Sequence, residues 1–309
     1  MNHSASSLAI KEHAIRLGFD ACGIARAQRL SRQEAFLKTW LERGLHAGMN
    51  YMSNYFDKRV DPRELLPGAQ SVISVLLNYY PEKQQHAGGL KVAKYAYGKD
   101  YHRVIKEKLK QLLKSIQSEI TPCEGRFFTD SAPVLDRAWA AEAGLGWIGK
   151  NTNLIVPQQG SFFFIGELII DIELEYDVPI EDHCGSCTKC IQACPTNALV
   201  LPYLLDSNRC ISYHTIESKN TIPEKYRGKF ENWIFGCDIC QDVCPWNRFS
   251  KQTHEPAFQP DEEFLRMDKD DWRALSEEKY KKRFSGKALE RKGFEGIKNN
   301  IAFVSEESE

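Results

Sequence analysis

Eight of the ten cysteines stand at spacings that suit iron-sulfur chemistry. The first run follows the pattern C-x2-C-x2-C-x3-C-P, and its members are Cys184, Cys187, Cys190, Cys194 and Pro195. Bacterial ferredoxins use this run for cubic 4Fe-4S clusters, because thiolates spaced by two residues reach three corners of one cube while the fourth points to a neighbouring cluster. The second half of the pattern recurs at Cys237, Cys240, Cys244 and Pro245, and Cys210 stands between the runs. The sequence therefore predicts two clusters with eight thiolate ligands.

The last cysteine of each run should ligate the other cluster. We therefore expect one cluster on Cys184, Cys187, Cys190 and Cys244, and the other on Cys194, Cys210, Cys237 and Cys240. A pair of zinc sites is the alternative, since C-x2-C pairs also bind zinc, although zinc ribbons do not use the tight triple run. The remaining Cys22 and Cys123 suit a buried apolar role.

Composition and charge narrow the class of protein. The 309 residues are 42% apolar and 27% charged, which is ordinary for a globular protein. The longest apolar stretches, Ser71 to Tyr80 and Ser161 to Ile170, are much shorter than the roughly 20 residues that cross a membrane. The N-terminus shows no export signal, so we expect a soluble cytoplasmic redox protein with reduced thiols. A formal net charge of -1 excludes nucleic-acid binding through bulk positive charge.

Hydrophobic periodicity predicts helices and strands that alternate up to about residue 175. The apolar positions of residues 101–120 recur at three- and four-residue steps, which predicts an amphipathic helix with a solvated lysine face. Further helices are expected over residues 5–17, 32–45 and 134–143, and strands over residues 71–80, 126–129, 153–156 and 162–172. Beyond Phe249 the chain is polar, with helical segments expected over Asp261 to Phe284 and Gly286 to Val304.

A glycine motif after the predicted helix at 134–143 offers a second kind of chemistry. Gly144, Gly146 and Gly149 match G-x-G-x-x-G, and Asp171 follows at the distance of a dinucleotide fingerprint. Such a loop should follow a strand and open a helix, whereas a helical pattern precedes this one and an extended pattern follows. We expect a tight turn from helix to strand here, with nucleotide binding as the alternative.

Long stretches of the chain are similar to one enzyme family. The main ones are FFTDSAPVLDRAWAAEAGLGWIGKN from Phe127, GSFFFIGELIIDIELE from Gly160 and CGSCTKCIQACPTNAL from Cys184. Others are KRVDPRELLPGAQSVISV from Lys58, YAYGKDYH from Tyr95, RCISYHTIE from Arg209 and IFGCDICQDVCPWNRF from Ile234. In these stretches, up to about Phe249, the chain resembles the epoxyqueuosine reductases, cobalamin-dependent enzymes of queuosine synthesis in tRNA.

The resemblance implies an α+β fold in three parts. These are a cobalamin-binding and catalytic α/β sandwich over residues 1–175, a ferredoxin-like module over residues 176–250 and a short helical tail over residues 251–309. Cobalamin is expected between the first two parts. The implied cofactor contacts are Arg59, Tyr95, Asp130, Lys150, Asn151, Ser161, Ser212 and His214.

The resemblance also assigns a proton donor, Asp130, with Thr129 in place of the valine that the family usually has before it. Taken without the family, Asp130 would be a turn or cap residue. Burial under the corrin is expected to raise its pKa and so to keep the acid protonated. Asp100 and His102 begin the D-x-H-x-x-G signature of histidine-ligated cobalamin proteins, but residue 105 is Ile. We therefore expect His102 to be structural, and the lower cobalt face to lack a protein ligand.

The implied reaction is reduction of epoxyqueuosine at the tRNA wobble position to queuosine. Clusters would pass electrons to cobalt, fed by an external donor of flavodoxin or ferredoxin type. A monomer without membrane contact is expected, which would read mainly the anticodon loop. Many members continue into a helical-repeat domain, of which ERKGFEGIKNNIAFV resembles only the first helix. Phosphate contacts would then come from Lys225, Arg227, Lys229, Arg248, Lys281, Lys282 and Arg283, although each run alone is typical of a solvated face.

Two rival interpretations stay open at this stage. A reductive dehalogenase would also pair cobalamin with two clusters, but such enzymes usually carry a twin-arginine export signal, which this sequence lacks. A non-catalytic electron carrier would use the first 180 residues only to dock a partner. Failure to bind cobalamin, with normal clusters, would favour that second interpretation.

Overall fold

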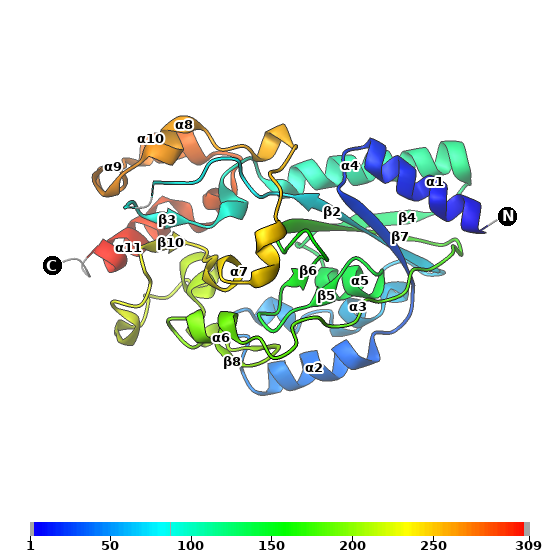
Figure 1. The fold of residues 1–309 in the computed structure, drawn as a ribbon, viewed down its shortest axis with the longest axis horizontal. Coiled ribbons are helices and arrows are strands. Elements are labelled where there is room, and N and C mark those ends of the chain that lie inside the picture. The colour runs from blue at the N-terminus through cyan, green and yellow to red at the C-terminus, as the bar shows by residue number, and fades with distance from the viewer. Residues whose placement is uncertain (1–2, 87, 306–309) are drawn as a thin grey trace.

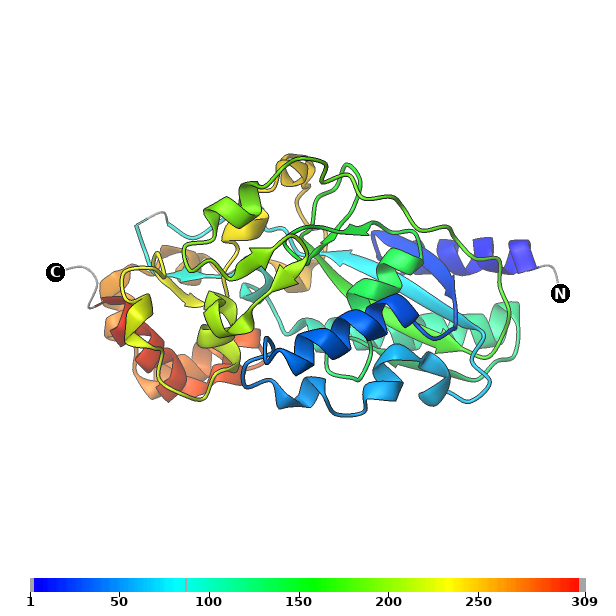
Figure 2. The same ribbon diagram turned by 90° about the horizontal axis from the view of Figure 1, so that it is seen from below.

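The computed structural model describes residues 3–86 and 88–305. Figure 1 shows an elongated molecule whose sheet lies toward the N-terminal end, while the tail and the cysteine-rich segment lie toward the C-terminal end. Figure 2 shows the same division from below, with the tail against the cysteine-rich segment. Among the described residues, no helix is long and apolar enough to cross a membrane.

An antiparallel sheet of order β1-β2-β7-β4 forms the scaffold. Its strands are β1 (Ala21–Arg26), β2 (Ser71–Asn78), β7 (Phe163–Ile170) and β4 (Gly125–Phe128). Every residue of β2 is buried, which explains its nearly continuous apolar run, because helices cover both faces of this strand. Two short hairpins accompany the sheet, made by β5 (Trp147–Ile148) with β6 (Leu154–Ile155) and by β8 (Leu199–Leu201) with β9 (Leu204–Leu205).

Helices pack on both faces of the sheet, as the predicted sandwich requires (Figure 1). On one face, α1 (His3–Arg16) and α4 (Tyr101–Ser115) contact the side chains of Ile73, Val75 and Leu168. On the other face, α5 (Asp136–Glu142) packs Trp139 and Ala140 against the alternate residues of the same strands. Each large apolar side chain buried in this way contributes about 1.5–3 kcal/mol. The remaining helices of this half are α2 (Ser31–Glu42) and α3 (Phe56–Val60).

The cysteine-rich segment is built from short elements between loops. Its helices and strand are α6 (Lys189–Ala193), α7 (Ile239–Asp242) and β10 (Trp233–Phe235). Strand β10 pairs in parallel with β3 (Lys91–Val92), which comes from the first half of the chain. Short 3-10 and π turns connect the elements, at Asn50–Met52, Pro62–Glu64, Lys94–Ala96, Ile116–Ile120, Ser207–Arg209, Tyr213–Glu217, Glu224–Tyr226, Pro245–Phe249, Pro256–Phe258 and Ala288–Lys292.

The tail has shorter helices than expected. The segment predicted over Asp261 to Phe284 divides into α8 (Glu262–Arg266), α9 (Lys269–Arg273) and α10 (Glu277–Phe284), and α11 (Gly293–Ser305) follows. The break has a local cause, because Asp268 and Ser276 each accept hydrogen bonds from the first backbone N–H groups of a new helix.

A single hydrophobic core joins the tail to both earlier parts of the chain. Trp272 and Phe284 of the tail stack at 5.7 Å and pack in one cluster with Phe235 and Tyr97. The core thus includes residues from all three expected domains, and the domain bounds themselves stay a prediction.

The glycine motif forms the expected turn. Helix α5 ends before Gly144, whose φ of +71° is a left-handed conformation that favours glycine. A Cβ on Gly146 would lie 2.2 Å from the carbonyl oxygen of Ile155, so close strand packing requires this glycine too. No helix follows the motif, and the prediction of a turn from helix to strand is confirmed.

Candidate active site

The first cysteine set lies around an open cavity of about 230 Å³. Its members are Cys184, Cys187, Cys190 and Cys244, and the wall is completed by His183, Trp246 and Arg248 among others. Three of these thiols come from the loop before α6 and its first turn, while Cys244 follows α7. The structure thus brings together the four thiols that the crossover rule assigns to one cluster.

The second set lies deeper. Burial raises the pKa of the thiols of Cys210, Cys237 and Cys240, and the close approach of their neighbours in the set raises it further. Cys194 belongs to the same group, since its charge acts on both Cys210 and Cys240. The backbone N–H of Ala198 donates to the sulfur of Cys194 at 3.2 Å, as expected for a thiolate ligand.

The cysteines fit iron-sulfur clusters better than single metal ions. All ten are free of disulfides. Within residues 3–86 and 88–305, no three His, Cys, Asp or Glu side chains converge as they would around one ion. A zinc ion needs sulfurs at about 2.3 Å, whereas the first set surrounds a cavity large enough for a cluster. Cys22 and Cys123 pack against the apolar core of the sheet, as predicted.

Asp130 lies just beyond strand β4, at a left-handed φ of +54°. The side chain is 57% exposed, and its Oδ2 accepts a short hydrogen bond from the hydroxyl of Tyr101. The ring of Tyr101 stacks on Phe164 at 4.2 Å, so the donor is fixed by the core of the sheet. Asp130 is therefore an oriented carboxylate at the surface of a rigid scaffold.

Two neighbouring side chains control the electrostatics of Asp130. Partial desolvation raises its pKa, but the nearby imidazole of His102 and the hydrogen bond from Tyr101 outweigh that effect and hold the pKa below the usual 3.8. The rise in pKa that was expected on burial under the corrin concerns the cofactor-bound protein and stays a prediction. The sequence could not show the two groups that face this carboxylate.

His102 is more than the expected structural neighbour. Its Nδ1 lies 2.7 Å from Oδ1 of Asp100, and its Nε2 lies 3.6 Å from Oδ2 of Asp130. Both contacts start from the first turn of α4, where Asp100 also accepts the backbone N–H of His102 at 3.0 Å. The half signature D-x-H thus places one imidazole between two carboxylates.

The predicted cofactor contacts fall into two groups. The first group contacts the cysteine-rich segment. Lys150 donates to the backbone carbonyl of Cys187 at 3.0 Å, and Asn151 donates to the backbone carbonyl of Cys240 at 3.1 Å. The hydroxyl of Ser161 donates to Gln241 at 2.9 Å. These three residues hold the loops that carry the cysteines.

The other group consists of Arg59, Tyr95, Ser212 and His214. Arg59 is buried and donates to the backbone carbonyl of Tyr51 at 2.6 Å, while Tyr95 is packed between the rings of Tyr101 and Phe235. Ser212 hydrogen-bonds to the Cys210 thiol.

His214 is buried, which lowers its pKa, and its Nε2 lies 3.0 Å from the carbonyl oxygen of Asn208. Its Nδ1 is buried and has no hydrogen-bond partner among the described residues. Such an unpaired polar atom favours a bound partner at this position.

A large groove was not predicted from the sequence. It has a volume of about 1110 Å³ and is lined by residues 48–51, by residues 216–224 and by the tail. Arg291 of the tail pairs with Glu217 at 2.8 Å, and Tyr51 donates to the same carboxylate at 3.4 Å. Arg291 on the wall of the groove and Asp130 act electrostatically on each other. Its size suits a large polar ligand.

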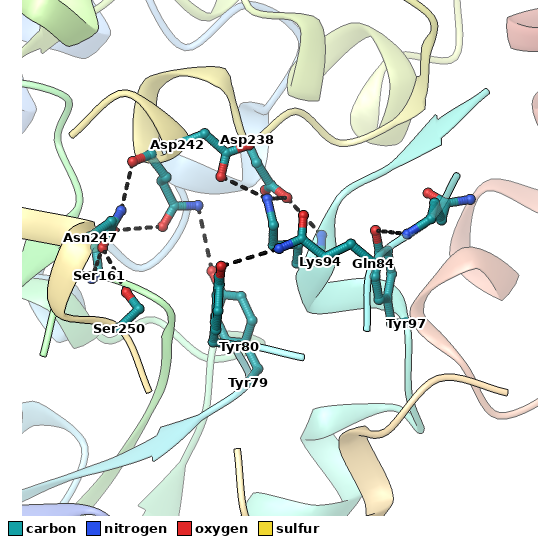
Figure 3. A network of polar contacts seen from close by, with 12 residues as sticks. Tyr79, Tyr80, Gln84, Lys94, Tyr97, Ser161, Asp238, Asp242, Asn247 and Ser250 are labelled. Atoms are coloured by element: carbon teal, nitrogen blue, oxygen red, sulfur yellow. Dashed lines mark hydrogen bonds and ion pairs between the residues drawn. The ribbon is translucent and has the colours of Figure 1, made fainter. Parts of the chain in front are cut away.

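A buried ion network was also missed. Figure 3 shows Lys94 pointing toward Asp238 and Asp242 at helix α7. Lys94 is 6% exposed, and its Nζ lies 2.7 Å from Asp242 and 3.5 Å from Asp238. On the other side of α7, Asn247 accepts the backbone N–H of Ser161 at 2.6 Å. The network fixes the helix that carries Cys240 against the first half of the chain.

The basic residues expected to meet tRNA are not equally available. Arg227 lines the groove and contacts Glu224. Arg283 is only 16% exposed and pairs with Glu263 and Asp261, and Lys281 pairs with Glu277 at 2.7 Å. Arg248 lies over the ring of Phe249 at the mouth of the first cysteine cavity. The groove and its tail residues are therefore better placed for a polyanion than the lysine run of α10.

Two family models match the chain. The model of the 4Fe-4S double cluster binding domain matches residues 183–247, and the model described as Epoxyqueuosine reductase QueG, DUF1730, matches residues 59–131. These spans contain all eight predicted cysteine ligands and the segment from Arg59 to Asp130.

Curated relatives cover nearly the whole chain. An epoxyqueuosine reductase of Cellulophaga algicola is 56% identical over 295 residues, which is 96% of each protein. The Escherichia coli epoxyqueuosine reductase is 43% identical over 299 residues, covering 95% of this chain and 79% of the relative.

Solved structures agree with the fold described above. The crystal structure of an epoxyqueuosine reductase with an epoxyqueuosine-modified tRNA-Tyr stem loop superposes with a TM-score of 0.89 at 33% identity, over 96% of this chain and 80% of that one. A Bacillus subtilis epoxyqueuosine reductase, with its catalytic aspartate loop swung out of the active site, gives 0.87 at 34% identity over the same shares. A catabolic reductive dehalogenase shares the fold alone, with a TM-score of 0.54 at 17% identity over 82% of this chain and 33% of that one.

Proposed function

This chain belongs to the epoxyqueuosine reductase family, and we propose that it reduces the epoxide of epoxyqueuosine in tRNA to the alkene of queuosine. The observation that best supports this proposal is that the folded molecule combines a two-cluster module, an oriented carboxylate and a large groove. The reaction removes the epoxide oxygen as water, which consumes two electrons and two protons. The chain must therefore supply an electron route, a proton donor and a place for a nucleotide.

The two cysteine sets supply the electron route through two 4Fe-4S clusters. The open cavity at Cys184, Cys187, Cys190 and Cys244 makes the first cluster the natural entry point for an external donor, for which we propose a flavodoxin or ferredoxin. The second cluster, on Cys194, Cys210, Cys237 and Cys240, lies deeper and next to Ser212, on the side of the proposed cofactor.

Cobalamin is the second cofactor that we propose for the region between Asp130 and the module. Bound there, it supplies a strongly nucleophilic metal centre that one-electron donors can reduce. Tyr95, Ser212 and His214 are the residues that we propose hold it, and the unpaired Nδ1 of His214 fits a polar ligand at this position. Arg59, Lys150, Asn151 and Ser161 shape the site through the backbone segments that they hold.

Asp130 delivers the proton to the epoxide oxygen from Oδ2. Tyr101 orients this oxygen, and exposure of the carboxyl leaves its other face open to substrate. A general acid must come within hydrogen-bond reach of the atom that it protonates, and a loop position at the end of a strand allows that approach. A Bacillus subtilis relative was solved with its catalytic aspartate loop swung out of the active site, which supports a mobile proton donor at Asp130.

The groove is the proposed site of the anticodon loop. Arg291, Lys292 and Lys219 on its wall can meet phosphates, while Tyr51 offers a ring on which an unstacked base can lie. A relative was solved with a modified stem loop, which supports the same class of substrate. We further propose that the protein acts as a monomer in the cytoplasm, where tRNA is present and thiols stay reduced.

The test uses the protein loaded with clusters and cobalamin under anaerobic conditions. A stem loop carrying epoxyqueuosine is incubated with a chemical reductant, and mass spectrometry follows loss of one oxygen atom from the nucleoside. Conversion of the stem loop supports the proposal. Absence of conversion, together with halide release from a halogenated phenol, would instead assign a dehalogenase, and normal clusters without cobalamin binding would assign an electron carrier.

A further inference from the structure

The first turn of α4 places three side chains in a row that the sequence signature alone did not explain. Oδ1 of Asp100 lies 2.7 Å from Nδ1 of His102, and Nε2 of the same imidazole lies 3.6 Å from Oδ2 of Asp130. The imidazole is 22% exposed, so it contacts solvent as well as both acids. This arrangement is that of a histidine whose tautomer is set by one carboxylate and whose other nitrogen faces a second.

The proposed reaction needs a proton that Asp130 cannot supply alone. The nearby imidazole of His102 and the hydrogen bond from Tyr101 hold the pKa of Asp130 below 3.8, so near neutral pH this carboxyl carries no proton to give. The pKa of its neighbour His102 is shifted in the opposite direction. Burial lowers the pKa of His102, but pairing with Asp130 and Asp100 outweighs burial and raises the pKa above 6.5. The proton of the pair therefore resides on the imidazole and not on the carboxyl.

We propose that His102, oriented by Asp100, is the positioning residue that supplies each proton to Asp130, so that the functional acid of this site is the pair and not the carboxyl alone. The inference rests on the proposed function. The proton moves from Nε2 of His102 to Oδ2 of the Asp130 carboxylate, and the carboxyl formed in this way gives that proton to the epoxide oxygen and becomes a carboxylate again. Neutral His102 then regains a proton from solvent through its exposed edge. No electron moves in these steps, and each turn of the relay transfers one proton.

The surroundings permit this relay. Tyr101 stacks on His102 at 4.1 Å and donates to Asp130, which keeps both partners in place. Other groups also act on Asp130: Asp136 accepts its backbone N–H at 3.4 Å, and the positive charge of Arg291 lowers its pKa from the tail side. On the far side of the loop, Lys106 donates to Ser131 at 3.1 Å.

A purely structural role for His102 is the alternative, because Asp100 also caps α4. A cap would need only the backbone N–H of residue 102, which any residue provides. Both imidazole nitrogens would then be free to face water, whereas each faces a carboxylate. The two roles predict different pH behaviour.

The experiment compares single-turnover rates on the epoxyqueuosine stem loop between pH 5.5 and 9. The proteins are wild type, His102→Gln and Asp100→Asn, loaded with clusters and cobalamin and reduced chemically. The matched control is His13→Gln, since His13 also faces a carboxylate, Glu119 at 3.7 Å, but lies on α1. Gln keeps the shape and a hydrogen-bond donor but carries no titrating proton.

We expect the wild-type rate to stay level until the pH passes the pKa of His102 and then to fall. In His102→Gln the rate should fall across the whole range, and it should be about 100-fold below wild type at pH 7.5. Asp100→Asn should move the descending limb to lower pH, and His13→Gln should follow wild type. A uniform loss of rate with an unchanged pH profile in His102→Gln would overturn the proposal, as would an unchanged rate.

A second readout does not depend on turnover. NMR titration of the labelled His102 imidazole in the cluster-loaded protein should give a pKa above 6.5, and Asp130→Asn should bring that pKa down. An unchanged value in Asp130→Asn would overturn the coupling even if the stem loop reacts. A wild-type protein that leaves the stem loop unchanged, but shows the coupled titration, would instead refute the proposed function.

Discussion

Glu167, in the centre of the sheet, gives a sharp test of how buried charge limits the stability of this fold. The residue lies on β7 directly opposite Ser74 and is fully buried. Ser74 donates to one carboxyl oxygen at 2.7 Å, while the other oxygen, Oε1, has no hydrogen-bond partner. Burial, together with the charge of Asp136, raises the pKa of Glu167 well above 4.5. We therefore predict that Glu167→Gln stabilises the protein at neutral pH.

The magnitude follows from linkage. An acid whose pKa is raised on folding contributes stability that is complete below its unfolded pKa and is lost as pH rises toward its folded pKa. From 4.5 upward the wild type loses about 1.4 kcal/mol per pH unit, while the amide loses none. The gain for Glu167→Gln should therefore vanish near pH 4.5 and grow above it by about 1.4 kcal/mol per pH unit until the pH reaches the folded-state pKa of Glu167.

Thermal unfolding of the anaerobic, cluster-loaded protein measures this gain. A change of 1 kcal/mol moves Tm by roughly 2–4 °C in a chain of this class, so the difference in Tm between the two proteins should widen by about 3–6 °C per pH unit above 4.5. Glu107→Gln, on the exposed face of α4, is the matched control and should shift stability by less than about 0.5 kcal/mol. A stabilisation that did not change with pH, or a loss of stability, would refute a neutral Glu167 in the folded state.

Three further changes test the site. Asp130→Asn should bind cobalamin and stem loop normally but react about 100-fold or more slowly, because the amide cannot give up a proton; equal single-turnover rates would remove Asp130 from the mechanism. Cys210→Ser should halve the iron content from about eight to about four per chain, measured by iron analysis after anaerobic purification, and a loss of no iron would contradict its assignment as a ligand. Lys94→Met should lower the free energy of unfolding by about 3–5 kcal/mol, since it leaves Asp238 buried without its cation, and a Tm equal to that of wild type would show that the pair is dispensable.

The periodicity of apolar residues and the spacing of the cysteines allowed much of the fold and the metal site to be predicted. The apolar run of β2 and the lysine-faced helix α4 lie where they were expected, and the cysteine sets approach one another as the spacing requires. Family resemblance added what spacing could not: Asp130 stands in an ordinary turn sequence, and only its neighbours in space make it distinctive.

Contacts between distant segments could not be predicted in the same way. Strand β1 was missed because Ala21 to Arg26 is short and contains Gly23, which packs against the carbonyl of Ala143. The large groove needs three segments that are far apart in sequence, and the Lys94 network joins residues 144 and more positions apart. The lowered pKa of Asp130 could not be predicted for the same reason, since His102 and Tyr101, which lower it, come from another element.

The parallel pairing of β3 with β10 carries a consequence for synthesis of the chain on the ribosome. Lys91 and Val92 find their partners in Trp233 and Phe235, about 140 residues later. At roughly 5–20 residues per second, the ribosome needs about 7–30 s to make that partner. Throughout this interval the apolar segment around Val92 and Tyr97 lacks the core in which both are later buried. Nascent chains of this protein should therefore be bound by chaperones until the tail emerges. Truncation within α11 should leave the chains bound to chaperones.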